Sequence, residues 1–172
     1  MITGNDVILS NNIEIKRPDL CKIGNHVAID FGFYCTTALN IGDYVHIGPH
    51  VSCIGGRDGK FELHGYNNVM AGARIICCSD RFDNSGLFGA LVPDKFKGKQ
   101  IKKPVVLERF SNVGTNAIIL PGSILRQGVL VAAGSLLMGD TVPWGVYKGN
   151  PAKLTKIIDS KNILEMVKQN EL

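Results

Sequence analysis

The sequence has no hydrophobic run long enough to cross a membrane. Its most apolar stretch, Val129 to Met138, falls well short of the roughly 20 residues that a spanning helix needs. This stretch also lies far from the N-terminus, so it is not a signal peptide. The five cysteines are odd in number and include no Cys-x-x-Cys pair, so they do not predict a disulfide framework. We therefore expect a cytoplasmic protein with reduced thiols and no membrane span.

The excess of positive over negative charge is also small. The net charge is +4, whereas a nucleic-acid binder would carry its basic residues as a stripe with interleaved aromatic residues. We therefore expect no nucleic-acid partner. A modest positive charge suits a small polyanionic ligand, such as a phosphate-bearing cofactor. The chain has 172 residues, of which 45% are apolar, and these numbers predict one folded domain.

Glycine, in contrast, is abundant at 20 residues and interrupts most windows that could otherwise form a helix. Apolar residues instead recur every six positions in two blocks. The first block is Ile23, Ile29, Cys35, Ile41, Ile47 and Cys53, and the second is Leu107, Val113, Ile119, Leu125, Val131 and Leu137. Each of these except Cys53 is followed four positions later by an inward-pointing residue that we expect to be small or of modest size, because the chain bends there.

A period of six is neither the 3.6 of a helix nor the alternation of an ordinary strand. It fits a short strand followed by a turn, and three such units close one triangular coil. Stacked coils bury a continuous apolar column, which is the hexapeptide parallel β-helix. The sequence therefore predicts an all-β solenoid over residues 1–158.

The repeat is interrupted between the two blocks. Residues 54–60 predict a tight turn that protrudes. A longer insertion, from about 79 to 104, predicts an irregular loop, and insertions of this length in compact domains are usually functional. Its lysines suit either a solvated surface or an anionic substrate, and they are Lys95, Lys97, Lys99, Lys102 and Lys103.

The period stops at Pro143. In the tail, Ile163, Leu164 and Val167 stand at helical spacing, with Asp159 or Ser160 available as a cap. We therefore predict one short helix over residues 159–172.

Two segments resemble the left-handed β-helix acyltransferases. They are KKPVVLERFSNVGTNAIILPGSILRQGVLVAAGSLLMGD and KGNPAKLTKII, which are similar to segments of galactoside, maltose and xenobiotic acetyltransferases. The resemblance covers nearly the whole chain. It implies a left-handed parallel β-helix, a homotrimer with active sites between neighbouring prisms, and acetyl-coenzyme A as the co-substrate, with no metal.

The resemblance also implies where the cofactor binds. In the family, the pantetheine arm lies along the last coils, where small residues let it approach the backbone, and lysines lie near the phosphates. Met138 and Gly139 stand where the family usually has a Thr-Lys pair, so we expect one side-chain contact to be lost. The implied cofactor-binding residues are Thr115, Ala133, Met138, Gly139, Lys153 and Lys156.

Sugar O-acetyltransferases of the family have a catalytic histidine in the insertion, where this chain has Asp80. A hydroxyl must lose its proton as it attacks, and this requires a base that is effective near neutral pH. An amine already carries a reactive lone pair, so a carboxylate that collects its proton is sufficient. We therefore predict an N-acetyltransferase acting on a nucleotide-linked amino-deoxy sugar for surface polysaccharide, such as O-antigen or capsule. Asp80 would be catalytic with help from His50, and the predicted substrate contacts are Tyr34, Arg81 and Phe82.

Three alternatives stay open. The first is O-acetylation of a sugar or antibiotic hydroxyl, with His50 as the base. The second is a metalloenzyme of the γ-carbonic-anhydrase kind, which needs three histidine ligands, two of them five residues apart; here His46 and His50 are four apart. The third is a non-catalytic hexapeptide scaffold, which would not bind coenzyme A.

Overall fold

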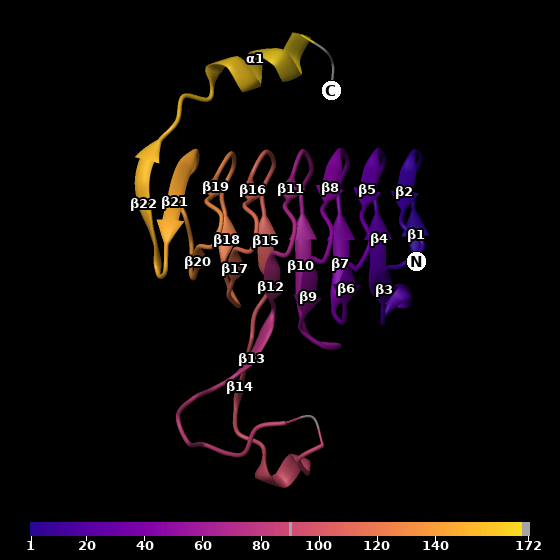
Figure 1. The fold of residues 1–172 in the computed structure, drawn as a ribbon, viewed down its shortest axis with the longest axis vertical. Coiled ribbons are helices and arrows are strands. Elements are labelled where there is room, and N and C mark those ends of the chain that lie inside the picture. The colour runs from indigo at the N-terminus through magenta and orange to yellow at the C-terminus, as the bar shows by residue number, and fades with distance from the viewer. Residues whose placement is uncertain (90, 170–172) are drawn as a thin grey trace.

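The structure is a computed structural model that describes residues 1–89 and 91–169. Short strands follow one another around a triangular prism (Figure 1), and each sheet pairs strands of successive coils in parallel. The chain passes through sheets A, B and C in turn, so each circuit adds one strand to every sheet. This arrangement confirms the parallel β-helix that the period of six predicts.

The strand bounds are as follows for the described residues. Sheet A contains β1 (Ile2–Thr3), β4 (Cys21–Ile23), β7 (Ala38–Ile41), β10 (Lys60–Leu63), β15 (Val105–Leu107) and β18 (Ile124–Leu125). Sheet B contains β2 (Val7–Leu9), β5 (Val27–Ile29), β8 (Val45–Ile47), β11 (Asn68–Val69), β16 (Asn112–Val113), β19 (Leu130–Val131), β21 (Gly145–Gly149) and β22 (Ala152–Ile157). Sheet C contains β3 (Glu14–Ile15), β6 (Tyr34–Cys35), β9 (Ser52–Ile54), β12 (Arg74–Ile76), β17 (Ile118–Ile119) and β20 (Leu136–Leu137). Outside these sheets lie β13 (Cys78–Asp80), β14 (Gln100–Lys102), the 3₁₀ turns η1 (Pro18–Leu20) and η2 (Asp94–Phe96), and the helix α1 (Lys161–Gln169).

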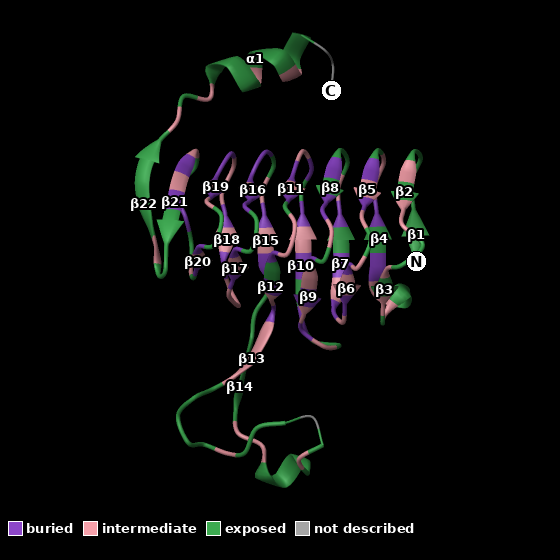
Figure 2. Cartoon of the chain, in the orientation of Figure 1, coloured by how far each residue is buried: buried purple, intermediate pink, exposed green. Residues whose placement is uncertain are grey.

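The core of the prism is built from the period of six. Every apolar residue of the two blocks is buried, and so are the residues four positions later, except Arg57 after Cys53, where the repeat is interrupted. Buried and exposed positions alternate along the strands, as Figure 2 shows. The expectation that the second position must be small is wrong, because Phe33 fills one such position and is 1% exposed. The coil therefore adjusts to side-chain volume, provided that the side chain is apolar and points inward.

Aromatic residues line the vertex where sheet A turns into sheet B, which we call the A–B vertex. Their backbones hold positive φ angles, a strained conformation for bulky residues. Their rings stack along the prism, with centroids 4.7 to 6.3 Å apart, and this stacking offsets part of the strain. Gly128 completes the row, because a Cβ there would lie 2.1 Å from Trp144 Cε3. The aromatic residues are His26, Tyr44, Tyr66, Phe110 and Trp144.

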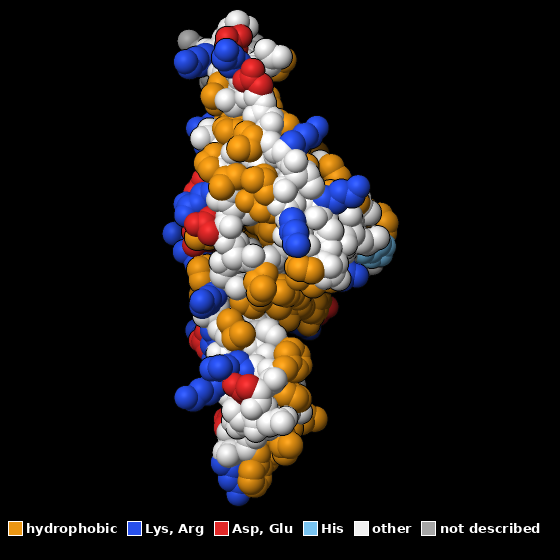
Figure 3. All heavy atoms as spheres, turned by 90° about the vertical axis from the view of Figure 1, so that its left-hand side faces the viewer, with side chains coloured by type: hydrophobic (Ala, Val, Ile, Leu, Met, Phe, Trp, Pro, Cys, Tyr) orange, Lys and Arg blue, Asp and Glu red, His pale blue; other side chains and the backbone are white. Residues whose placement is uncertain are grey.

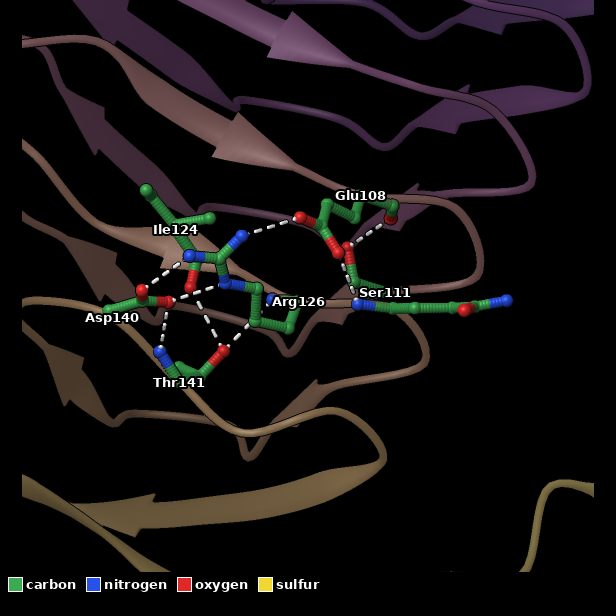
Figure 4. Close-up of polar contacts among 7 residues, drawn as sticks. Glu108, Ser111, Ile124, Arg126, Asp140 and Thr141 are labelled. Atoms are coloured by element: carbon green, nitrogen blue, oxygen red, sulfur yellow. Dashed lines mark hydrogen bonds and ion pairs between the residues drawn. The ribbon is translucent and has the colours of Figure 1, made fainter.

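An ion network fastens the last coils together (Figure 4). Arg126 Nε donates to Asp140 Oδ1 at 2.8 Å, and its Nη1 donates to Glu108 Oε1 at 3.0 Å. Asp140 Oδ1 also accepts from the backbone N–H of Thr141 at 2.8 Å. The hydrogen bond from Arg126 lowers the pKa of Asp140. The carboxylates of Glu108 and Asp140 therefore both bind Arg126, and these contacts hold neighbouring coils in register.

The C-terminal end of the prism differs from the prediction. The repeat does end near Pro143, but the chain then forms a hairpin in which β21 pairs with β22 antiparallel. Helix α1 follows, and Asp159 Oδ1 accepts from the N–H of Lys161 at 3.0 Å, as expected for a cap. Positions 170–172 of the predicted helix lie outside the described residues. Within the described chain, no helix is long and apolar enough to cross a membrane.

Candidate active site

The insertion leaves the prism as a two-stranded ribbon, in contrast to the irregular loop expected (Figure 1). β13 and β14 pair antiparallel, with Cys78 opposite Lys102, Ser79 opposite Ile101 and Asp80 opposite Gln100. Opposed residues of a ribbon share a face, and successive residues alternate between faces. Asp80, Gln100, Cys78 and Lys102 therefore form one face, while Ser79 and Ile101 belong to the other.

Two contacts position the ribbon and its carboxylate. Gln100 Nε2 donates to Asp80 Oδ1 at 2.8 Å, so a neutral amide holds one oxygen of the half-buried Asp80. Lys102 Nζ donates to Asp58 Oδ2 at 2.7 Å. This bond fastens the ribbon to the turn between β9 and β10, where the sequence predicts a protruding turn. It lowers the pKa of Asp58 and raises the pKa of Lys102.

Two cavities flank the ribbon. The first, about 620 Å³, is the more polar of the two; it is lined by Ile54, Gly55, Gly56, Arg57, Asp58, Cys78, Ser79, Asp80, Phe82, Gln100 and Lys102. The second, about 340 Å³, is mostly apolar; it is lined by Ser79, Asp80, Arg81, Phe82, Asp83, Ile101, Leu120, Pro121 and Met138. We call them the polar cavity and the apolar cavity. Ser79, Asp80 and Phe82 line both, so the carboxylate residue stands where the two meet.

The apolar cavity joins residues that the sequence predicts for different roles. Asp80, Arg81 and Phe82 come from the ribbon, and Met138 comes from the turn after β20. Arg81 Nε lies 2.9 Å from Asp83 Oδ2, so its charge is already paired. Phe82 is 87% exposed and its ring packs only at a tilt against Phe88, with centroids 5.4 Å apart. Phe82 is therefore available to a ligand.

The other residues predicted to bind the cofactor lie at two other places on the last coils. Thr115 and Ala133 are exposed on successive turns between sheets B and C, and Gly134 N donates to Thr115 O at 2.8 Å. A Cβ at Gly114 would lie 2.5 Å from Ala133 N, so only glycine lets these turns approach so closely. Gly139 follows Met138 at the opposite edge of sheet C.

Basic residues gather on the terminal hairpin. Lys153 pairs with Lys148, and Lys156 pairs with Val146, so the hairpin carries three exposed lysines. Figure 3, which views the prism from this end, shows Lys and Arg side chains among hydrophobic ones. The sequence did not indicate Lys148 as a possible cofactor contact, because its position beside Lys153 depends on the antiparallel pairing of the hairpin. The hairpin supplies positive charge next to the last coils.

Comparison with known proteins places the chain in a family. It is 27% identical over 168 residues to dTDP-4-amino-4,6-dideoxy-D-glucose acyltransferase from Escherichia coli, spanning 95% of this chain and 84% of that protein. The structure matches AntD, an N-acyltransferase from Bacillus cereus in complex with dTDP and 3-hydroxybutyryl-CoA, with a TM-score of 0.90 and 26% identity over 99% of this chain and 92% of AntD. The chain is a hexapeptide-repeat left-handed β-helix acyltransferase.

A further relative of this acyltransferase is a probable macrolide acetyltransferase from Lysinibacillus sphaericus. The identity is 30% over 116 residues, which span 67% of this chain and 61% of that protein. No protein-family model matches the chain. Membership of the acyltransferases therefore follows from the near full-length likeness of sequence and fold.

In this acyltransferase, His50 and Tyr34 lie outside both cavities of the chain. His50 is exposed on the turn between sheets B and C, and its ring meets Phe31 edge-on at 4.7 Å. Tyr34 is half-buried on β6. Their proposed roles stay predictions, and a single chain does not bring either residue to Asp80.

The zinc alternative has no support in the geometry of this acyltransferase. His46 Nε2 lies 2.9 Å from Asp30 Oδ2, which is an isolated pair. Among the residues that the structure describes, no group of three or more His, Cys, Asp or Glu side chains could hold a metal ion.

Proposed function

We propose that this acyltransferase moves an acyl group from coenzyme A to the amino group of a nucleotide-linked amino-deoxy sugar. The observation that carries the proposal is the position of Asp80, a half-buried carboxylate between a polar and an apolar cavity. The E. coli relative is named for dTDP-4-amino-4,6-dideoxy-D-glucose, and a variant of AntD has been solved with that sugar nucleotide and coenzyme A. Both names point to the same class of acceptor.

Asp80 suits the proton transfer that amide formation requires. The lone pair of the amine attacks the thioester carbonyl, a C–N bond forms, and the C–S bond breaks. Nitrogen must lose one proton and the departing thiolate must gain one, so a carboxylate at the junction collects the first and supplies the second. Gln100 holds Oδ1 of Asp80, which orients the carboxylate without adding a charge.

The polar cavity suits the nucleotide part of the acceptor. Arg57 and Lys102 line it, and hydrogen bonding to Asp58 raises the pKa of Lys102, which keeps this amine protonated. Asp58 and Asp80 also line this cavity, and Lys102 is bound to Asp58, so Arg57 is the cation that would contact a diphosphate directly. Met138 borders the apolar cavity on the other face of the ribbon, whereas the turns with Thr115 and Ala133 lie at the opposite edge of sheet C; these turns and the hairpin lysines are the proposed contacts of coenzyme A.

We further propose that the enzyme works as a homotrimer in the cytoplasm, in the synthesis of a surface polysaccharide. The insertion supports a neighbouring subunit, because its large apolar side chains are exposed in the single chain; they include Phe82, Leu87, Phe88, Leu91 and Phe96. A neighbour that covered them would also close the cavities at the ribbon. Light scattering in solution measures this directly, and a monomeric mass would contradict it.

The second candidate is O-acetylation of a sugar or antibiotic hydroxyl, which the likeness to the probable macrolide acetyltransferase favours. It requires a base stronger than an ordinary carboxylate. His50 would have to reach the site from a neighbouring subunit, since it lines neither cavity of its own chain.

The test is release of free thiol from acetyl-CoA and butyryl-CoA with a panel of amino and hydroxy sugars, free and linked to dTDP or UDP. We expect turnover with the nucleotide-linked amino sugars, and loss of at least about a hundredfold in kcat for Asp80→Asn. Asp94→Asn is the matched control, because Asp94 is an exposed carboxylate of the same insertion that pairs with Lys97 outside both cavities. Turnover with hydroxy sugars alone, or full activity of Asp80→Asn, would refute the proposal.

A further inference from the structure

The turn between β9 and β10, residues 55–59, is bonded tightly to the prism. Thr36 Oγ1 accepts hydrogen bonds from the backbone N–H groups of Gly55 at 3.2 Å and Gly56 at 3.4 Å. Gly59 N donates to Gly55 O at 3.0 Å, which closes the turn. A Cβ at Gly59 would lie 2.6 Å from Gly55 Cα, so the two ends of the turn leave no room for a larger residue. The turn therefore has a well-defined shape and place.

One side chain of this turn holds the ribbon. Asp58 Oδ2 accepts from Lys102 Nζ at 2.7 Å, and Lys102 lies on β14, on the same face of the ribbon as Asp80. Because the turn is bonded to Thr36, this ion pair connects the ribbon to the body of the prism. The two side chains are 64% and 43% exposed, and an exposed ion pair adds little to stability. We therefore expect its main effect to be on the position of the ribbon.

The turn and the ribbon carry two different parts of the proposed site. Arg57, on the turn, is the cation proposed to contact the diphosphate, and Asp80 stands on the ribbon; both line the polar cavity. The amine and the diphosphate of one acceptor molecule are joined by a fixed number of bonds. The two protein groups must therefore keep a matching spacing, because a small misplacement of reacting groups lowers the rate strongly.

We propose that Asp58 and Lys102 are positioning residues. Their ion pair sets the spacing between Arg57 and Asp80, and so it places the amine of the acceptor beside the carboxylate once the diphosphate is bound. This inference rests on the proposed function and adds to it the device that aligns the acceptor. Thr36 supports the device from outside both cavities, through the backbone of the turn.

The first test uses the full chain with acetyl-CoA and dTDP-4-amino-4,6-dideoxyglucose, and calorimetry with dTDP alone. Asp58→Asn should lower kcat about tenfold, because the ribbon loses its fixed place. dTDP should bind at least as tightly as to the wild type, because Arg57 remains and a negative charge is removed. The reversal Asp58→Lys with Lys102→Asp rebuilds the pair and should regain kcat to within about threefold, whereas each reversal alone should lower it.

The second test changes the support of the turn. Thr36→Val removes the acceptor of two backbone N–H groups, so both kcat and the affinity for dTDP should fall, each about three- to tenfold. Thr36→Ser keeps the hydroxyl and should keep both values. Thr37→Val is the matched control, because Thr37 Oγ1 is buried without a hydrogen-bond partner within the described part of the chain. This variant should retain both kcat and affinity.

Amide hydrogen exchange gives a readout that does not depend on turnover. In Asp58→Asn, the ribbon segments 78–81 and 99–103 should exchange faster than in the wild type, while the prism strands stay unchanged. Unchanged exchange of the ribbon would overturn the inference, even if the wild type acylates no amino sugar and the proposed function has failed. A double reversal that does not regain kcat would also overturn it and leave the proposed function standing. Weaker binding of dTDP to Asp58→Asn would overturn it as well, because Asp58 would then contact the nucleotide.

Discussion

The prism and the insertion use large apolar residues in opposite ways. In the prism such residues recur every six positions and are buried, as Ile119 is at 0% exposure. In the insertion, Phe82 is 87% and Leu91 is 99% exposed. Burial stabilises the prism from within the single chain, whereas the apolar side chains of the insertion contribute little to its stability because they stay exposed.

The carboxylates differ in the same way. In the prism, Glu108 and Asp140 are both bound to Arg126, so their charge is used to join coils. In the insertion, Asp80 accepts a hydrogen bond from the neutral amide of Gln100. If the proposed function holds, stability and chemistry belong to separate parts of the chain, and changing each part alone tests this.

The largest expected effect comes from removing the tip of the insertion. Residues 82–98 are replaced by Asn-Gly, which joins Arg81 to Lys99, the last backbone-bonded pair of the ribbon, through a tight hairpin turn. We expect kcat/KM to fall at least about a hundredfold, because Phe82 and the apolar tip are lost, while Tm changes by only a few degrees. Unfolding of this variant would contradict the separation of the two parts.

A substitution in the core of the prism should lower the stability of the protein and leave kcat nearly unchanged. Ile119→Ala removes buried methylene groups between coils and should lower the free energy of unfolding by about 2–5 kcal/mol. Urea denaturation measures this loss. Below the transition, kcat should stay close to that of the wild type, because Ile119 lines neither cavity. A loss of kcat without a loss of stability would contradict the proposed separation between prism and insertion.

A smaller effect is expected for Gln100, which we regard as a positioning residue. Gln100→Leu removes the donor to Asp80 and keeps the approximate volume, so kcat should fall about tenfold while KM for both substrates stays within about twofold. Gln127→Leu, the same change on the prism, is the control. A rise of KM alone would show that Gln100 binds substrate and does not orient the carboxylate.

The smallest effect concerns acid stability. Arg126 lowers the pKa of Asp140 in the folded state, so this carboxylate contributes stability above its unfolded pKa of about 3.9 and loses it as the pH falls through the folded value. Wild type should therefore be more stable than Arg126→Gln at pH 7, and the difference should shrink below about pH 4. Both groups are partly exposed, so the difference is modest. A constant difference at all pH values would contradict it.

The insertion and the terminal hairpin show where prediction from the sequence ends. Asp80 could be proposed from the sequence because it stands where the family has histidine, and its role stays a prediction. Gln100 could not, because it lies 20 residues away and its role depends on the register of the ribbon. The antiparallel β21–β22 pair was also missed, although the Gly149–Ala152 turn lies between two short apolar-polar segments that could have indicated a hairpin.

The sequence by itself determined the prism, because a coil contacts mainly the coils before and after it, and this local contact leaves a period of six in the chain. Only the tertiary structure decided that Asp80, Asp58, Leu120 and Met138 border one site. Asp80 comes from β13, and the other three residues come from three separate turns. Their meeting depends on how the ribbon leaves the prism, and that geometry has no periodic pattern in the sequence.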